Sequence, residues 1–300
     1  MSIPEVRTVL VDGASVGYYE YGTPAGRPVF ALHGTPASGA GFAWADQPAR
    51  ARGQRLIAPD RPGVGLSSRS SGWSVGTYPA RLAAFADALD IGRFAVWGYS
   101  GGGPYAAATA ACLPDRVTAA AVTAGMGQVG VWATVGDFEK TDRRFLALAS
   151  ERPRLARAML GVAARLARRS PASALRSFAK QLGPGDRAVL AELGTPRDAM
   201  ALFTQAFLRG AQGVVDDYAA LARAWDVDVA TIRCPLFVAH GTADRMVPIG
   251  HSRALADRVG SATMVAWPDE GHLATVRHVG EVLDALGTGP DVGSRARSVT

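Results

Sequence analysis

The first part of the chain alternates between short apolar runs and amphipathic segments. Runs rich in Val, Ile, Leu and Ala predict buried strands, and apolar residues three or four positions apart predict helices. In chain order the pattern predicts strands at 6–11, 16–21 and 28–32, a helix at 41–52, a strand at 56–58, a helix at 77–89, a strand from 94 to 99, a helix to 113 and a strand at 117–123. Strands alternating with helices indicate an α/β fold, a mostly parallel central sheet with helices on both faces.

The alternation stops near residue 126 and resumes near residue 229. Between these positions the pattern predicts only helices, interrupted by Pro and Gly. Afterwards it predicts a strand at 235–239, a helix at 251–259, a strand at 263–266 and a helix at 273–286. We therefore expect a core of residues 1–125 and 229–287, a helical cap insertion at 126–228 and a flexible tail at 288–300. We expect the cap to cover the carboxyl edge of the sheet, where open α/β sheets bind ligands.

Composition narrows the class of protein. Hydrophobic residues make up 48% of the 300 positions, which is enough for a large buried core. The N-terminus lacks a signal-peptide pattern, and no apolar run approaches the roughly 18 residues of a membrane span. Two cysteines, Cys112 and Cys234, do not make a disulfide framework or a metal site, and both are expected in the core. We expect a soluble, reduced, cytoplasmic protein without a cofactor or a bound metal.

The net charge of +6 arises in the predicted cap. Residues 126–225 contain 15 Lys and Arg against 9 Asp and Glu. Arginines at helical spacing, such as Arg165, Arg168 and Arg169, fit one solvated helix face, although a preference for acidic ligands is an alternative. No nucleic-acid-binding motif accompanies them. We expect neither a nucleic-acid nor a membrane partner, and a homodimer is one option for the assembly.

One motif names a candidate nucleophile. The apolar run from Phe94 ends in Gly98-Tyr99-Ser100-Gly101-Gly102 and leads into an Ala-rich helical segment. A G-x-S-x-G sequence between a strand and a helix holds its serine in a tight turn at the carboxyl end of the strand. The sequence therefore predicts Ser100 as a nucleophile. The alternative is a surface serine in a Gly-rich turn.

A serine nucleophile needs a base to take its proton and a carboxylate to orient that base. In this arrangement the acid and then the histidine follow the serine along the chain. Asp244 and His272 each come directly after a late predicted strand, at the sheet edge that carries Ser100. The region after the strand at 117–123 has no carboxylate, so Asp244 is the predicted acid, with an Asx turn or helix cap as its alternative.

The remaining histidines fit structural roles. His33 and His240 precede glycines at strand ends and are expected to hold turns, and His251 and His278 fall within predicted helices. Asp269 and Glu270, beside His272, are expected to be exposed turn residues.

Acyl transfer also requires donors aimed at the developing oxyanion. The backbone N–H of Gly101 follows the nucleophile and is one candidate. The second is the N–H of Thr35, in the loop after the strand at 28–32, although an ordinary turn would also fit this loop.

These stretches together resemble the α/β-hydrolase fold family, in its cap-bearing branch. The matching segments are HGTP at 33–36, DRPGVGLS at 60–67, GYSGGG at 98–103, HGTADRMVP at 240–248 and EGH at 270–272. The resemblance covers about residues 5–287. The serine at position 100, where dehalogenase-type and epoxide-hydrolase-type relatives carry aspartate, implies cleavage of an ester, thioester, lactone, amide or C–C bond. The loop at 33–36 differs from the HGGPG of proline iminopeptidases. The segment Asp60-Arg61-Pro62-Gly63 is expected to brace the loop structurally and to take no part in the chemistry.

The function expected from these residues is hydrolysis of a small, largely apolar carboxylic ester, lactone or thioester through an acyl-enzyme. Aromatic residues expected to contact this acyl substrate are Trp73, Trp132, Phe138, Phe207 and Tyr218. The alternatives on the same triad are a cofactor-free perhydrolase, a C–C hydrolase or a biosynthetic cyclase. A receptor-like binder of small molecules with little turnover is a further alternative.

Overall fold

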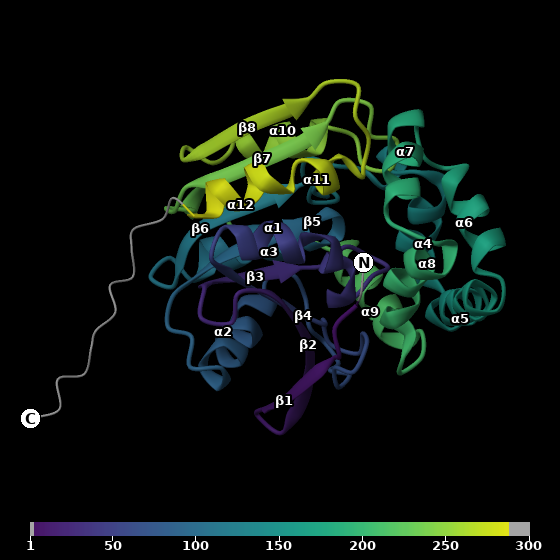
Figure 1. Ribbon diagram of the computed structural model, residues 1–300, viewed down its shortest axis with the longest axis horizontal. Coiled ribbons are helices and arrows are strands. Elements are labelled where there is room, and N and C mark those ends of the chain that lie inside the picture. The colour runs from purple at the N-terminus through teal and green to yellow at the C-terminus, as the bar shows by residue number, and fades with distance from the viewer. Residues whose placement is uncertain (1–2, 288–300) are drawn as a thin grey trace, which may run out of the picture.

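A mostly parallel sheet of eight strands runs through the centre of the molecule (Figure 1). The computed structural model describes residues 3–287, so the predicted tail at 288–300 lies outside the described residues. The strand order is β1-β2-β4-β3-β5-β6-β7-β8. The bounds are β1 (Arg7–Val11), β2 (Ala14–Gly22), β3 (Arg27–Leu32), β4 (Gln54–Pro59), β5 (Phe94–Tyr99), β6 (Val117–Thr123), β7 (Leu236–Gly241) and β8 (Ala262–Trp267). The pairs β1–β2 and β2–β4 are antiparallel and the others parallel, so β3 to β8 end at one common edge.

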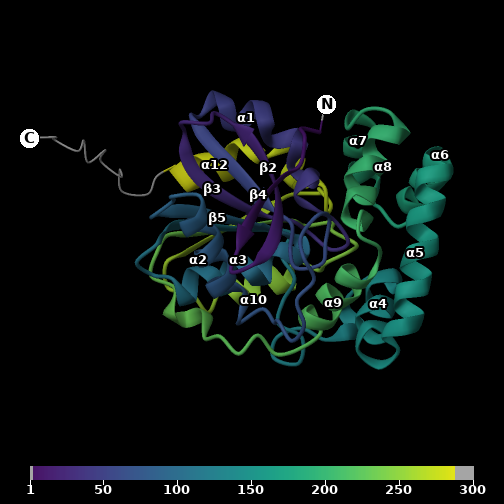
Figure 2. The same ribbon diagram turned by 90° about the horizontal axis from the view of Figure 1, so that it is seen from below.

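Each face of the sheet is covered by its own helices (Figure 2). The helices of the core are α1 (Asp46–Ala51), α2 (Tyr78–Ala88), α3 (Gly103–Cys112), α10 (Gly250–Ala256), α11 (Ala274–Arg277) and α12 (Val279–Gly287). On β5, Ala95 and Trp97 pack into the same apolar cluster as α12, whereas Phe94 and Val96 pack into the cluster that contains α2 and α3. This alternation follows from the two-residue period of a strand and explains why β5 is apolar throughout.

Six helices between β6 and β7 gather beside the carboxyl edge of the sheet (Figure 1). They are α4 (Lys140–Glu151), α5 (Pro153–Arg169), α6 (Pro171–Ala179), α7 (Pro184–Glu192), α8 (Pro196–Thr204) and α9 (Gln212–Leu221). Four of them begin with proline, which fits the first helical position because no N–H bond is needed there. In the described chain this segment contains no strand, only an isolated bridge between Val129 and Ala133. Below, these six helices are called the cap.

Two expectations are wrong. The predicted helix at 273–286 is divided at His278, whose ring stacks on Trp267 with centroids 4.5 Å apart and bonds to Glu270 and Glu281. Cys112 is exposed, because it is the last residue of α3, while Cys234 is buried as expected. Among the helices of residues 3–287, none combines the length and apolar character that a membrane span requires.

Candidate active site

Ser100 lies at the turn between β5 and α3. Its φ is +54°, in the left-handed region that non-glycine residues seldom adopt. The turn is tight because backbone approaches on both sides: a Cβ at Gly98 would meet the carbonyl oxygen of Gly102, and a Cβ at Gly102 would meet that of Leu32. Glycine at these two positions therefore permits the strand–turn–helix geometry that presents the Ser100 hydroxyl.

His272 and Asp244 converge on Ser100 from the loops after β8 and β7. His272 Nε2 lies 3.0 Å from Ser100 Oγ, and His272 Nδ1 lies 2.8 Å from Asp244 Oδ2. The other oxygen of Asp244 accepts the backbone N–H groups of Met246 and Val247 at 2.8 and 3.0 Å. This hydrogen-bonded chain gives the imidazole the tautomer in which Nε2 can take a proton from Ser100.

Asp244 and His272 each shift the pKa of the other toward its charged form. Burial opposes the ionised form of Asp244, but His272 and His240 hold the pKa of its carboxyl below the ordinary value. Burial lowers the pKa of His272, but Asp244 outweighs this effect, with further contributions from Asp186 and Asp142, so the pKa lies above 6.5. The site thus keeps an ionised acid behind a base that is easily protonated.

His240 is part of this site, a contact that the sequence reasoning missed. Its Nε2 lies 3.0 Å from Asp244 Oδ2 and 2.8 Å from the carbonyl oxygen of Val247, and its Nδ1 lies 2.7 Å from Ser252 Oγ. The side chain is fully buried. His240 therefore holds the turn, as expected, and also forms a hydrogen bond to the candidate acid. The spacing of four residues between His240 and Asp244 was a usable signal, because both flank one turn.

The two predicted oxyanion donors lie next to each other. A Cβ at Gly101 would be 3.1 Å from the backbone N of Thr35, and a Cβ at Gly34 would be 3.2 Å from Cβ of Ser100. The loop after β3 thus packs directly on the turn that carries Ser100. Arg61 is buried behind this loop and bonds to Asp217 of α9.

The cap brings two carboxylates toward the site. Asp186 of α7 accepts the N–H of Leu273, the residue after the candidate base, at 2.7 Å. Asp142 of α4 accepts the hydroxyl proton of Tyr218 at 2.8 Å. Burial raises the pKa of Asp142 to about 6, although this bond and His272 favour the ionised form. The sequence pattern did not indicate either residue, because each lies within a helix and not at the end of a predicted strand.

The aromatic residues predicted to contact substrate are packed against other aromatic or basic side chains. Their ring neighbours are Tyr78 and Tyr105 for Trp73, Trp225 and Arg258 for Trp132, His251 for Phe138, Phe203 for Phe207 and Phe145 for Tyr218. These are contacts of core packing, and the substrate-binding role of the five remains a prediction.

The other histidines have structural partners. His33 accepts the N–H of Arg61 at 3.2 Å, and burial lowers its pKa well below 6.5. His251 accepts the N–H of Gly127 at 3.2 Å. Within residues 3–287, no group of three or more His, Cys, Asp or Glu side chains is arranged to hold a metal ion.

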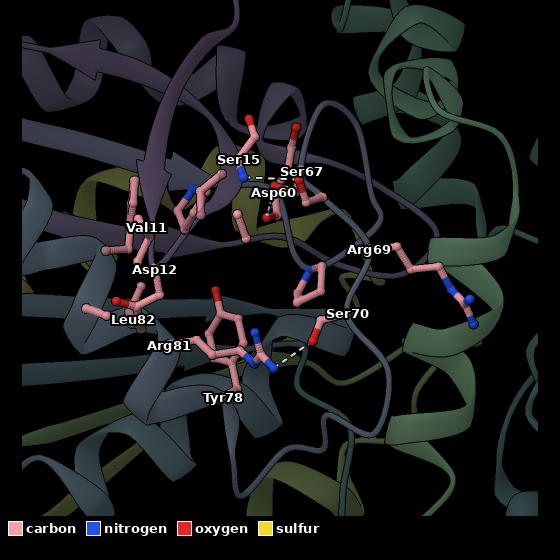
Figure 3. A pocket seen from close by; sticks show the side chains of 17 residues that line it. Val11, Asp12, Ser15, Asp60, Ser67, Arg69, Ser70, Tyr78, Arg81 and Leu82 are labelled. Carbon is pink, nitrogen blue, oxygen red and sulfur yellow. Dashed lines mark hydrogen bonds between the residues drawn. The ribbon is translucent and has the colours of Figure 1, made fainter.

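A separate hollow of about 290 Å³ lies between the β1–β2 hairpin and α2 (Figure 3). Its lining includes Ser15, Ser68 and Tyr78, but none of Ser100, Asp244 and His272. Within it Arg81 donates to Ser70 at 2.7 Å. This hollow is therefore distinct from the candidate active site.

Comparison with known proteins agrees with this architecture. Residues 27–278 match the family model of the alpha/beta hydrolase fold. The chain belongs to this family. A 2-hydroxy-6-oxo-2,4-heptadienoate hydrolase of Pseudomonas putida is 38% identical over 143 residues, 45% of this chain and 47% of that protein, so that match spans about half of each. A non-heme chloroperoxidase of Streptomyces lividans is 28% identical over 87% of this α/β-hydrolase and 90% of its own length.

Solved structures share the fold at lower identity. An esterase from Thermogutta terrifontis superposes with a TM-score of 0.68 at 20% identity, covering 94% of this chain and 96% of its own. An enol-lactonase from Burkholderia xenovorans LB400 superposes with a TM-score of 0.65 at 19% identity, covering 93% and 97%. The family model and the hydrolase-named relatives make this α/β-hydrolase an enzyme.

Proposed function

We propose that this enzyme is a serine hydrolase that cleaves a small, uncharged, largely apolar carboxylic ester, lactone or thioester. The observation that carries the proposal is the hydrogen-bonded chain from Ser100 through His272 to Asp244, next to the amides of Gly101 and Thr35. A serine hydroxyl with a base and an orienting carboxylate forms an acyl-enzyme with carbonyl substrates.

In the proposed reaction, Ser100 Oγ attacks the carbonyl carbon while His272 Nε2 takes its proton. The N–H groups of Gly101 and Thr35 donate to the oxyanion, and Asp244 stabilises the imidazolium. His272 then gives the proton to the leaving oxygen or sulfur as the bond to the acyl carbon breaks. Water, deprotonated by His272, attacks the carbonyl carbon of the acyl-enzyme. His272 then returns this proton to Ser100 Oγ as the bond between Oγ and the acyl carbon breaks, which releases the acid and restores the Ser100 hydroxyl.

Electrostatics favour an uncharged substrate. The charged groups that raise the pKa of His272 are three carboxylates: Asp244, Asp186 and Asp142. Arg61, near the oxyanion loop, is fully buried and neutralised by Asp217, so it is not available to a substrate anion. A carboxylate-bearing substrate would therefore meet like charge close to the reacting atoms.

Hydrolysis of a C–C bond is the second candidate, because relatives include the heptadienoate hydrolase and a 2-hydroxymuconate semialdehyde hydrolase of Pseudomonas putida, 27% identical over 92% of this chain. These names denote substrates with a carboxylate. Turnover of such a dienoate with no turnover of neutral esters would favour this candidate.

The test is hydrolysis of p-nitrophenyl esters of increasing acyl length by the wild type and by Ser100→Ala. We expect Ser100→Ala to lower kcat by at least about 10³-fold, since the covalent route is lost. Ser177→Ala, an exposed serine of α6, is the matched control and should retain full activity. Equal turnover in wild type and Ser100→Ala would contradict the proposal. The acyl chain length that gives the highest kcat/KM would indicate the size of the acyl-binding site.

A further inference from the structure

The ion pair between Arg61 and Asp217 joins the core to the cap. Arg61 lies on the loop after β4, Asp217 lies on α9, and their side chains are 0% and 2% exposed. The contact is bidentate: Nε donates to Oδ1 at 2.8 Å and Nη2 donates to Oδ2 at 2.7 Å. Because desolvation of both charges offsets much of their attraction, such a pair is weak evidence for a gain in stability alone.

Both members of the pair hold the loop after β3. Arg61 Nη2 donates to the carbonyl oxygen of Gly34 at 3.1 Å and to Thr35 Oγ1 at 2.9 Å. Thr35 Oγ1 in turn donates to Asp217 Oδ2 at 2.5 Å. The other oxygen of Asp217 also accepts the hydroxyl proton of Tyr105, on α3, at 2.8 Å. One carboxylate thus connects the cap, the helix after the nucleophile and the loop that carries Thr35.

Two donors hold the carbonyl oxygen of Gly34, His33 Nδ1 at 2.8 Å and Arg61 Nη2 at 3.1 Å, and together they fix the direction of the Thr35 amide. The carbonyl of Gly34 and the N–H of Thr35 belong to one planar trans peptide group, so they point in opposite directions. A guanidinium that holds the Gly34 oxygen on the Arg61 side therefore directs the Thr35 N–H away from Arg61. Gly101 and Ser100 pack directly against this loop, since a Cβ at Gly101 would be 3.1 Å from the Thr35 backbone N and a Cβ at Gly34 would be 3.2 Å from Ser100 Cβ.

We propose that the Arg61–Asp217 pair positions the Thr35 amide as an oxyanion donor, so that cap helix α9 completes the oxyanion hole. The inference rests on the proposed function, and it makes Arg61 and Asp217 positioning residues that do not touch the substrate. Oxyanion donors act only when they are pre-aligned, so a small rotation of this peptide group reduces transition-state stabilisation more than substrate binding.

The test compares Asp217→Asn with Asp216→Asn in p-nitrophenyl ester hydrolysis. We expect Asp217→Asn to lower kcat about ten- to a hundredfold with KM changed less than about threefold, which approaches the loss of one oxyanion donor. Asp216, the preceding residue of α9, also pairs with an arginine, but its partner Arg69 has 55% of its side chain exposed. Asp216→Asn should keep kcat within about twofold.

A double variant separates positioning from folding. Arg61→Met with Asp217→Leu replaces both buried charges by apolar side chains, and such exchanges can restore stability. We expect its Tm to exceed that of Asp217→Asn while kcat stays low, because the guanidinium and the carboxylate no longer hold the Gly34 carbonyl and Thr35 Oγ1, and only the contact from His33 Nδ1 remains. A kcat that recovers together with Tm, or a folded Asp217→Asn with wild-type kcat, would overturn the inference. A wild type with neither Ser100-dependent turnover nor Ser100 labelling by a fluorophosphonate would overturn the proposed function and this inference with it.

Discussion

His272 should set the pH dependence of the enzyme. The imidazole must be neutral to accept the Ser100 proton, and nearby carboxylates raise its pKa above 6.5. Activity is therefore expected to rise with pH, with the midpoint of kcat/KM above pH 6.5. Asp142→Asn removes one of these negative charges and should move the midpoint to lower pH.

The measurement is a pH profile of kcat/KM for wild type, Asp142→Asn and the control Asp137→Asn. Asp137 is exposed and pairs with His251, so its neutralisation should leave the midpoint in place. A midpoint that moves upward in Asp142→Asn, or stays fixed, would contradict the electrostatic account.

At the scale of single residues, the sequence predicted which side chains come together where each of them directly follows a predicted strand. Ser100, Asp244 and His272 each follow a predicted strand, and the structure brings the three together. Asp217 was not predictable from strand ends, because it lies in a helix far from Arg61 along the chain. A signal existed nevertheless: Asp217 falls on the stripe of Val214, Tyr218 and Leu221 that α9 buries, where an isolated charge needs a partner.

Among the elements, β5 and α3 approach each other closely at the turn that carries Ser100. A Cβ at Gly98 would lie 2.7 Å from Cβ of Ala106 on α3 and would also meet the Gly102 backbone. Gly98→Ala should therefore lower the free energy of unfolding by about 2 kcal/mol or more, since backbone cannot move aside as a side chain can. Gly92→Ala, with no atom near the added methyl group, is the control for urea unfolding. Equal stability of the two variants would show that the turn can widen.

The bounds of the core strands were predictable from the periodicity of apolar residues. The bounds of the last core helix were predicted less accurately, and the cap helices were predicted only as a group. The strands occur within about two residues of the predicted bounds, because a buried parallel strand is a continuous apolar run. The predicted helix at 273–286 is interrupted because His278 makes tertiary contacts with Trp267, Glu270 and Glu281, which local periodicity does not encode. Individual cap helices were not assigned, although a proline begins four of them.

At the scale of the whole molecule, the cap and the sheet share one apolar cluster. Phe145 of α4, Leu160 of α5 and Tyr218 of α9 belong to the same cluster as Phe30 and Val96 of the sheet. We therefore expect a single cooperative thermal transition with equal calorimetric and van't Hoff enthalpies, of the order of 200 kcal/mol. Scanning calorimetry checks this, and two separate transitions would mean that the cap unfolds independently.

The cap contacts the candidate active site at two places, the loop that carries Thr35 and the residue after His272. Asp217 holds the loop of Thr35, and Asp186 accepts the N–H of Leu273 beside the candidate base. An insertion of this kind is not an interchangeable module. A chimera that receives the cap of another α/β-hydrolase would have to receive carboxylates at these two positions as well. Changes of substrate preference should therefore be reached more readily by altering residues within the present cap than by exchanging it.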